Sequence, residues 1–267
     1  MLRNFKTRWD WHVAMKAAIE DVLSNCYPRN WDEDHITRSL IGTLRDQFSH
    51  TSLDNDKRWA EGVQVAWDMY KNTGKRKMEQ YHGDIGVLVK IQFTKDCSLE
   101  GVAFVEAKRM YHEKLTYDAL EWSQLARLSA NSSNHRTLLY DYDVSAQPSP
   151  ALALTLPTVH LMALNDDTRE INKHCEDFSY CLVNRYFQGY ELDYNQRRVD
   201  AVKGLLAEQY DGVDYLLVSH LTLSPELEPS LETVEFNRQR FQSFETPALI
   251  AEDKPSNTPD DFNTPSM

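Results

Sequence analysis

The sequence predicts a mixed α/β fold, in which a helix, a three-stranded antiparallel sheet, a second helix and a further strand precede an α/β elaboration. Residues 85–105 contain two apolar runs separated by a short polar turn, which is typical of an antiparallel hairpin. Residues 31–48 and 116–130 repeat apolar side chains at helical spacing. With 267 residues, of which 41% are hydrophobic and 26% charged, the chain is long enough for one large domain or two small ones.

An amphipathic helix is expected over residues 8–24, ahead of the main domain. Its apolar positions recur at helical spacing and are Trp11, Met15, Ala18, Ile19 and Val22. Trp9 and Trp11 are interpreted as core or interface anchors rather than as platforms for stacked bases. Residues 27–30, Tyr-Pro-Arg-Asn, interrupt this helix, so we assign residues 1–29 to an N-terminal helix and residues 30–145 to the core that follows.

The helix at residues 31–48 brings an acidic residue to its buried side. Its apolar stripe consists of Ile36, Leu40, Ile41, Leu44 and Phe48. Asn30 and Glu33 fit the spacing of a capping box, which would give Glu33 a purely structural role. Glu33 also precedes Ile36 by three residues and Leu40 by seven, which places it on the apolar face of the helix. Asp34 is expected to be solvated.

Charged residues stand where the two strands of the predicted hairpin meet. Asp84 precedes the first apolar run, at residues 85–93. Glu106 and Lys108 follow the second run at positions i and i+2, so strand alternation places both on one face and Ala107 on the other. In an antiparallel pair the start of one strand lies beside the end of its neighbour, so we expect Asp84 to approach Glu106 and Lys108. The hairpin therefore predicts two carboxylates with an ammonium group beside them.

These residue types suit the hydrolysis of a phosphodiester. Mg²⁺ prefers oxygen ligands and retains several waters, so one or two carboxylates and a substrate phosphate are sufficient to bind it. Asp84, Glu106 and the carbonyl of Ala107 are the expected ligands, and Mn²⁺ is an expected substitute for Mg²⁺. The metal lowers the pKa of a bound water, and Lys108 is placed to orient that water or to stabilise charge on the phosphate.

The alternative for this cluster is a purely structural one. Acidic residues at strand ends and Glu-X-Lys tripeptides occur in many proteins without a catalytic role. The strand before Glu106 is apolar on both faces, which is typical of a central strand. Charged residues that leave such a strand need a partner or a metal, so burial favours the functional interpretation.

The arrangement of Asp84 with Glu106-Ala107-Lys108 resembles the PD-(D/E)XK nuclease superfamily, whose fold is called restriction-endonuclease-like. The resemblance covers residues 30–142. Gly83 occupies the position of the proline in the nominal motif, a departure that many members share. The resemblance implies an α/β fold with a restriction-endonuclease-like core, and Mg²⁺-dependent cleavage of nucleic acid.

The resemblance also implies supporting roles for residues outside the hairpin. In this superfamily a glutamate at the start of the preceding helix often reaches the metal, which makes Glu33 the third expected metal-binding acid. A glutamine on the helix after the Glu-X-Lys motif helps to hold the site in several branches, and Gln124 is the matching residue here. The tyrosine that one such branch carries four residues later is Leu128 in this chain. His82 is a candidate to act on the leaving group, with a turn histidine that has no role as the alternative.

The overall charge disfavours a nucleic-acid partner, but its distribution does not. The formal net charge is −12, and residues 225–267 contribute nine acids and three bases to it. Between residues 71 and 114, nine bases outnumber six acids. The residues expected to contact a nucleic-acid backbone are Lys75, Arg76, Lys77, Arg109 and Lys114, with Arg127 and Arg136 as weaker candidates. A solvated basic turn is the alternative for residues 75–77.

Further strands and helices complete the prediction. Strands are expected at residues 62–70, 136–142, 151–164 and 213–223, and helices at residues 178–187, 195–209 and 231–244. His160 and His220 fall in the apolar strands and are interpreted as core histidines. Residues 146–224 are assigned to an α/β elaboration of the same domain. Residues 225–267 form an acidic C-terminal segment that is expected to be disordered from about residue 246.

Several other kinds of site are disfavoured. The four cysteines lack the spacing of zinc ligands and are interpreted as buried thiols. No phosphate-binding glycine loop occurs, so ATP-driven work would need a partner such as an ATPase or helicase. The chain has neither an apolar stretch of about 18 residues nor a signal-peptide core, so we expect a cytoplasmic protein without membrane contact.

The expected function is Mg²⁺-dependent hydrolysis of nucleic-acid phosphodiester bonds, with DNA favoured as the substrate. By resemblance, such a protein serves in restriction, repair or defence against phage. Two alternatives stay open. One is a non-catalytic interaction subunit of a nucleic-acid-processing complex, and the other is hydrolysis of a different phosphoester, which the acidic balance favours slightly. Pairing of two copies as a homodimer also stays open.

Overall fold

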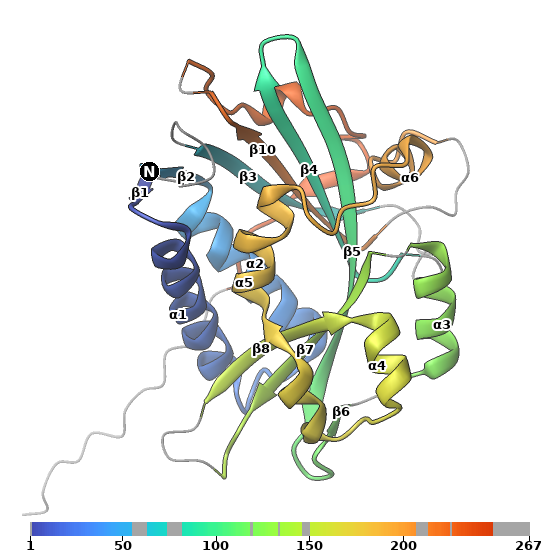
Figure 1. Cartoon of the computed structure of the whole chain (residues 1–267). Helices are drawn as coiled ribbons and strands as arrows, with labels where there is room; N and C mark the ends of the chain where they lie inside the picture. Colours follow the sequence, from blue (N-terminus) through green and yellow to red (C-terminus); the bar gives the residue numbers. More distant parts are fainter. Residues whose placement is uncertain are drawn as a thin grey trace, which may run out of the picture.

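One large mixed sheet with helices on both faces organises the chain (Figure 1). The computed structural model describes residues 2–54, 63–73, 82–117, 120–132, 134–145, 150–206, 213–224 and 226–247. The strand order is β1-β2-β3-β10-β4-β5-β7-β8-β9, with β11 also paired to β3 and β6 to β5. Parallel and antiparallel neighbours both occur, so the predicted mixed α/β class is confirmed.

The bounds of the strands are β1 Arg3–Phe5, β2 His50–Leu53, β3 Val63–Asn72, β4 Ile85–Thr94, β5 Cys97–Tyr111, β6 Thr116–Tyr117, β7 His135–Tyr142, β8 Ala151–Pro157, β9 Glu176–Asp177, β10 Tyr215–Thr222 and β11 Phe241–Ser243. The α-helices are α1 Arg8–Cys26, α2 Glu33–Phe48, α3 Trp122–Asn131, α4 Thr158–Leu164, α5 Phe178–Asn184 and α6 Gln196–Val202. Short 3₁₀ turns are η1 Arg169–His174, η2 Tyr186–Gln188 and η3 Leu231–Thr233.

The predicted hairpin is confirmed and forms the middle of the sheet. β4 and β5 are antiparallel, with Ile85 opposite Val105 and Gln92 opposite Ser98. β7 then adds to the other side of β5 in parallel, as a strand that follows α3. This arrangement places the start of β4 and the second half of β5 side by side, between β10 and β7.

β10 lies between β3 and β4, parallel to β4 and antiparallel to β3. The expected three-stranded antiparallel sheet is therefore interrupted, because a strand from the C-terminal half separates residues 63–72 from the hairpin. All eight residues of β10 are buried. A strand covered on both faces is typically rich in apolar residues, and residues 215–218 are an unbroken apolar run.

Helices cover the sheet on both sides. α1, α2 and α5 pack with the sheet in the largest apolar cluster, which includes the predicted stripes of residues 8–24 and 31–48. α3 and α4 contribute to a second cluster with β7 and β8, and α6 contributes to a third with β4, β5 and β10. Trp11 is fully buried, as expected for a core anchor, whereas Trp9 is 63% exposed.

Several predicted elements have different bounds. The helix expected at residues 116–130 begins only at Trp122, after the short strand β6. The helix expected at residues 178–187 is divided into α5 and η2, and the one expected at residues 195–209 is the short α6, with residues 207–209 outside the described ranges. The apolar stripes of these segments are weak or short, so the sequence pattern did not predict where each helix begins and ends.

Two predictions in the C-terminal half are wrong in type. Residues 151–164 divide at Pro157, where β8 ends and α4 begins, because proline has no N–H for the sheet ladder. His160 is consequently an exposed helical residue rather than a core histidine. Residues 231–244 form η3 and β11 instead of a helix, since Phe241 is buried and pairs with Asn72 of β3. Disorder from residue 246 falls largely on residues 248–267, which lie outside the described ranges.

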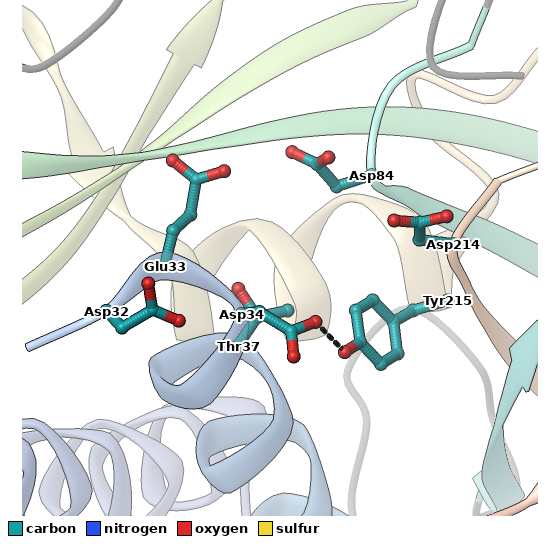
Figure 2. A pocket seen from close by; sticks show the side chains of 7 residues that line it. All are labelled: Asp32, Glu33, Asp34, Thr37, Asp84, Asp214 and Tyr215. Carbon is teal, nitrogen blue, oxygen red and sulfur yellow. Dashed lines mark hydrogen bonds between the residues drawn. The ribbon is translucent and has the colours of Figure 1, made fainter. Parts of the chain in front are cut away.

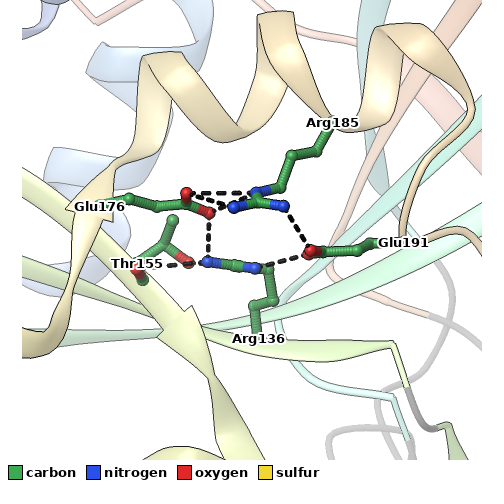
Figure 3. Close-up of polar contacts among 5 residues, drawn as sticks. All are labelled: Arg136, Thr155, Glu176, Arg185 and Glu191. Carbon is green, nitrogen blue, oxygen red and sulfur yellow. Dashed lines mark hydrogen bonds and ion pairs between the residues drawn. The ribbon is translucent and has the colours of Figure 1, made fainter.

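Arg136 belongs to a buried ion-pair network rather than to a phosphate-binding surface (Figure 3). Its guanidinium lies 2.6 Å from Oε2 of Glu191 and 2.5 Å from Oε1 of Glu176. Arg185 donates to both of these carboxylates as well. Only 4% of Arg136 is exposed, so the expectation that it meets phosphate is wrong. The network instead ties β7 to the segment that contains β9, α5 and Glu191.

The cysteine prediction is confirmed only in part. All four cysteines are free thiols, of which Cys26 and Cys181 are buried, Cys175 is half-buried and Cys97 is exposed. Cys97 begins β5 at the tip of the hairpin, where the first three residues of the strand are exposed to solvent.

Among the helices of the described ranges, none has the length and apolar character needed to cross a bilayer.

Candidate active site

Asp84 is fixed by both strands that flank β4. Its side-chain Oδ2 accepts a hydrogen bond of 2.7 Å from the Ala107 N–H in β5. Its main-chain carbonyl accepts one of 2.8 Å from the N–H of Tyr215, at the start of β10. The predicted approach of Asp84 to the Glu106-Ala107-Lys108 segment is thus confirmed. The Ala107 N–H donates to the side chain of Asp84 rather than to a main-chain carbonyl.

Glu106 holds the other two polar residues predicted for this site. Its Oε1 accepts a 2.7 Å hydrogen bond from Nζ of Lys108 and a 2.8 Å hydrogen bond from Nε2 of Gln124 in α3. Glu106 is 1% exposed and Lys108 is 7% exposed. The alternation of β5 therefore puts both on one face, as expected, and α3 delivers the predicted glutamine to the same oxygen.

Glu33 begins α2 and faces this group. Its Oε1 lies 3.8 Å from Nζ of Lys108. The predicted capping box is wrong, because the N-cap is Asp32, whose side chain accepts from the His35 N–H. The carboxylate of Glu33 is therefore not used for capping through Asn30, and it stands on the side of α2 that faces β5.

Burial and the charges of neighbouring groups shift the pKa values of these side chains. Burial raises the pKa of Asp84 well above its usual range, the charges of Glu106 and Asp214 add to the increase, and Lys108 and the Ala107 N–H oppose it. Burial likewise raises the pKa of Glu33 to about 7, with Lys108 opposing and Asp84 adding. Burial alone would lower the pKa of Lys108, but the facing carboxylates outweigh it and raise that pKa.

An acidic cavity of about 260 Å³ opens beside these residues (Figure 2). Its lining consists of Asp32, Glu33, Asp34, Thr37, Asp84, Asp214 and Tyr215. The carboxylates of Glu33 and Asp84 approach it from α2 and from the start of β4 (Figure 2). The cavity therefore brings solvent and any ligand directly to two of the predicted acids.

The lining residues that sequence reasoning missed include Asp214 and Tyr215, at the start of β10. Tyr215 is opposite Ile85 in the parallel pairing of β10 with β4, so Asp214 and Asp84 stand side by side at one edge of the sheet. The Tyr215 hydroxyl donates to Asp34, which also lies 3.6 Å from Nζ of Lys71. Asp34 is exposed, as expected, and its carboxylate is in addition bound across the cavity. The signal was the apolar run at residues 215–218, directly after Asp214, which favours a central strand.

Gly83 makes the close approach of the strands possible. Its φ of +84° lies in the left-handed region that glycine adopts readily. A Cβ at this position would lie 3.0 Å from the carbonyl oxygen of Val105, 3.1 Å from Oε2 of Glu106 and 3.1 Å from Nε2 of His135. The position requires glycine, which gives a physical reason for its replacement of proline in the resembled motif.

The remaining candidates do not line the cavity or lie outside the described ranges. His82 is 5% exposed and its ring stacks on Phe104 at 4.6 Å, so it is a packed residue and does not line the cavity. The Arg109 guanidinium lies 4.2 Å from the centre of the Tyr111 ring, and its charge opposes the raised pKa of Glu33. Lys114 is exposed near the same ring. Residues 75–77 and their predicted phosphate contacts fall outside the described ranges.

The carboxylate oxygens at this site are too few to coordinate a hard cation by themselves, so water molecules would have to supply the remaining ligands. Within the described part of the chain, no three His, Cys, Asp or Glu side chains converge to form a metal site. Asp84 and Glu106 nevertheless provide carboxylate oxygens beside a polar cavity, and the raised pKa of Asp84 means that additional positive charge would stabilise its ionised form. Mg²⁺ is commonly bound by one or two carboxylates and keeps several waters, so two carboxylates are compatible with its chemistry.

Comparison of the chain with protein-family models, with curated proteins and with solved structures finds no match.

Proposed function

We propose that this protein is a Mg²⁺-dependent nuclease that hydrolyses phosphodiester bonds of nucleic acid, with DNA as the favoured substrate and a restriction-endonuclease-like core. The observation that carries the proposal is the convergence at Glu106. Lys108 and Gln124 both donate to its Oε1, while Asp84 is bound to the adjacent Ala107 N–H. Residues of β5, of α3 and of the start of β4 thus form one polar group in the centre of the sheet, at the positions that the resemblance assigns to catalysis.

The metal ligands in this proposal are Asp84 and Glu106, with Glu33 and the Ala107 carbonyl as additional oxygen donors. When bound, a divalent cation lowers the pKa of a coordinated water and neutralises charge on the substrate phosphate. The buried carboxylate of Glu106, the half-buried one of Asp84 and that of Glu33, 3.8 Å from the lysine, supply the negative charge that such a cation requires. Mn²⁺ would bind the same oxygen ligands and serve as a substitute.

Lys108 supplies the positive charge in the reaction. Its ammonium group is held by Glu106, has a raised pKa and therefore stays protonated at neutral pH. It can orient the attacking water and stabilise negative charge on the phosphate oxygens. The water oxygen bonds to phosphorus as the bond from phosphorus to one ester oxygen breaks. The products are a phosphate monoester and a hydroxyl, with the water protons passing to solvent and to the leaving oxygen.

The favoured substrate follows from the chemistry of a polyanion. Arg109 and Lys114 lie on or just beyond β5, past the catalytic pair, and could contact phosphates that flank the scissile bond. Roles in restriction, repair or defence against phage, in the cytoplasm and with an ATPase or helicase partner, belong to the same proposal. They rest on the resemblance alone.

The test combines cleavage with metal binding. Wild-type protein and the Glu106→Gln variant are incubated with supercoiled plasmid, single-stranded DNA or RNA, in Mg²⁺, Mn²⁺ or EDTA. The proposal predicts cutting of DNA that requires metal and is lost in Glu106→Gln. Calorimetric titration of Mn²⁺ into Asp84→Asn should show weaker binding than into wild type, with Asp96→Asn in the hairpin turn as a control of equal charge change.

A folded wild-type protein that binds metal but cuts none of the substrates would contradict the nuclease proposal. That result would favour the alternative of a non-catalytic interaction subunit. Hydrolysis of nucleotides or small phosphoesters without cutting of polynucleotide would instead assign the same site to a different phosphoester.

A further inference from the structure

Lys71, which the proposed reaction has not used, borders the acidic cavity. It stands opposite Tyr215 in the antiparallel pairing of β3 with β10, so both side chains lie on one face of the sheet. Nζ of Lys71 donates a 3.2 Å hydrogen bond to the Tyr215 hydroxyl and lies 3.6 Å from Oδ1 of Asp34. Tyr215 and Asp34 both line the cavity, so these contacts place the ammonium group at its wall.

The Tyr215 hydroxyl links this lysine to Asp34. It donates its one proton to Asp34 (Figure 2) and accepts a hydrogen bond from Lys71. Burial raises the pKa of Tyr215, and Asp34 and Asp214 add to the increase. The charge of Arg38 opposes it. The hydroxyl therefore stays protonated at neutral pH, so a hydrogen bond as well as an ion pair holds the ammonium group in place.

The ammonium group of Lys71 retains donors for a ligand. It has three N–H groups, and among the described residues the Tyr215 hydroxyl is its one hydrogen-bond acceptor. The distance of 3.6 Å to Asp34 is that of an ion pair rather than of a hydrogen bond. The side chain of Lys71 is 28% exposed, so solvent reaches it. An oxyanion at the cavity wall can therefore accept from this group without displacing Tyr215.

Arg38 adds a second cation near this wall. It lies one turn after Asp34 on α2, and its charge acts on the Tyr215 hydroxyl. Figure 2 shows the hydrogen bond between Asp34 and Tyr215 below the carboxylates of Glu33 and Asp84. The cations and the two predicted metal-binding acids therefore approach the cavity from different sides.

We propose that Lys71 binds a phosphate of the nucleic-acid backbone that flanks the scissile one, from a position fixed by Tyr215 and Asp34. The inference rests on the proposed function, which brings a polyanion to this cavity. The acids of the site repel that polyanion, and cations on the facing wall offset the repulsion. Arg109 lies on β5, which β10 and β4 separate from β3. Contacts to Lys71 and Arg109 would therefore hold the backbone on both sides of the catalytic acids.

The first measurement is the salt dependence of DNA binding without metal. In EDTA, the fluorescence anisotropy of a fluorescein-labelled DNA duplex gives the affinity at a series of KCl concentrations. Each phosphate contact contributes about 0.9 to the slope of log affinity against log salt concentration. Lys71→Gln should reduce the slope by this amount, which corresponds to about eightfold weaker binding at about 0.1 M salt, relative to a reference of about 1 M. Lys71→Arg, which keeps the charge, should restore the wild-type slope.

Lys16 provides a matched control, because it is also a half-buried lysine paired with an aspartate. Its Nζ lies 3.1 Å from Oδ2 of Asp177 in β9, at the far edge of the sheet. Lys16→Gln should have the slope of wild type. Tyr215→Phe should weaken binding less than Lys71→Gln does and should leave the slope unchanged, because the ammonium group loses its hydrogen bond but keeps its charge.

The second measurement separates binding from catalysis. Single-turnover cleavage of the duplex in Mg²⁺ is followed as a function of protein concentration. Lys71→Gln should need more protein to reach its half-maximal rate, and its maximal rate should be close to that of wild type, because Lys71 does not contact the scissile phosphate. A lower maximal rate without a change in the half-saturating concentration would overturn the proposal.

Circular dichroism first establishes that each variant is folded, and Lys71→Met, which keeps the apolar part of the side chain, replaces Lys71→Gln if the latter is not. A wild type that binds and cuts DNA, with its slope unchanged in Lys71→Gln, would reduce Lys71 to an ion-pair partner of Asp34 and leave the nuclease proposal intact. A wild type that binds DNA but cuts none would count against the proposed function, and the metal-free salt dependence would then decide the role of Lys71 on its own. A wild type that binds no DNA would overturn both.

Discussion

Replacing Glu33 by Gln should stabilise the metal-free protein at alkaline pH, even though Glu33 is proposed to support catalysis. Its pKa is raised from 4.5 to about 7, so its ionised form is less favourable in the folded state than in the unfolded state. At about 1.36 kcal/mol per pKa unit, this difference corresponds to about 3.4 kcal/mol above pH 7. The amide variant removes this cost.

The net effect is smaller because the side chain is 34% exposed. Solvent screening reduces the interaction by about half. The variant also loses a favourable interaction of about 0.5 kcal/mol between the carboxylate and the N-terminus of α2. We therefore expect a gain of about 1 kcal/mol in the free energy of unfolding at pH 8.

The sign of the effect depends on pH in a defined way. Between pH 4.5 and about 7 the folded state binds more protons at Glu33 than the unfolded state, so the contribution of this group to stability falls as pH rises. Below pH 4.5 the carboxyl is protonated in both states, and Glu33→Gln should be neutral. Saturating Mg²⁺ should stabilise wild type at pH 8 more than it stabilises the variant.

Urea unfolding at pH 4.5 and pH 8 measures these differences. Asp21→Asn, on the exposed side of α1, serves as a control for the change in net charge. Loss of stability in Glu33→Gln at pH 8, or the same change at both pH values, would refute the electrostatic reasoning.

Three further predictions concern single contacts. Gly83→Ala should destabilise the fold by at least about 1–2 kcal/mol in urea unfolding, because alanine is strained at a φ of +84° and its Cβ would crowd Glu106; an unchanged midpoint would contradict this reading. Arg136→Met should cost about 3 kcal/mol, since it leaves the carboxylates of Glu176 and Glu191 with Arg185 alone, and a loss below 1 kcal/mol would mean that Arg185 compensates fully. Gln124→Leu should slow DNA cleavage about tenfold with little change in melting temperature, and unaltered cleavage kinetics would remove Gln124 from the site.

The hairpin and its acids could be predicted from the sequence because they depend on local pattern. The register of β4 with β5 follows from the turn between them, and strand alternation then fixes Glu106 and Lys108 on one face. Glu33 followed from its spacing to Ile36 and Leu40 on one helix face. The sequence could not show that Glu33 takes no part in capping the helix. Asn30 and Asp32 are both favourable N-cap residues, and only the backbone conformation of the folded chain makes Asp32 the N-cap.

The acidic cavity depends on contacts between distant parts of the chain. Asp214 reaches Asp84 only because β10 inserts between β3 and β4, and no local pattern specifies the neighbours of a strand. Phe241 likewise enters a strand because it packs against β3, which overrides the helical pattern of residues 231–244. The sequence around Arg136 did not reveal its ion pairs, because its partners Glu176 and Glu191 are 40 and 55 residues away in the chain.

The most direct test of the proposed site is the rate of plasmid cleavage in Mg²⁺ under single-turnover conditions for Lys108→Ala and for Lys90→Ala. Both lysines come from the central hairpin, but Nζ of Lys90 donates to the Thr233 carbonyl oxygen, far from the carboxylates. Loss of a positioned charge that stabilises the transition state should slow Lys108→Ala by at least about 100-fold, with Lys90→Ala close to wild type. Equal rates for wild type and Lys108→Ala would contradict the assignment of catalysis to this cluster.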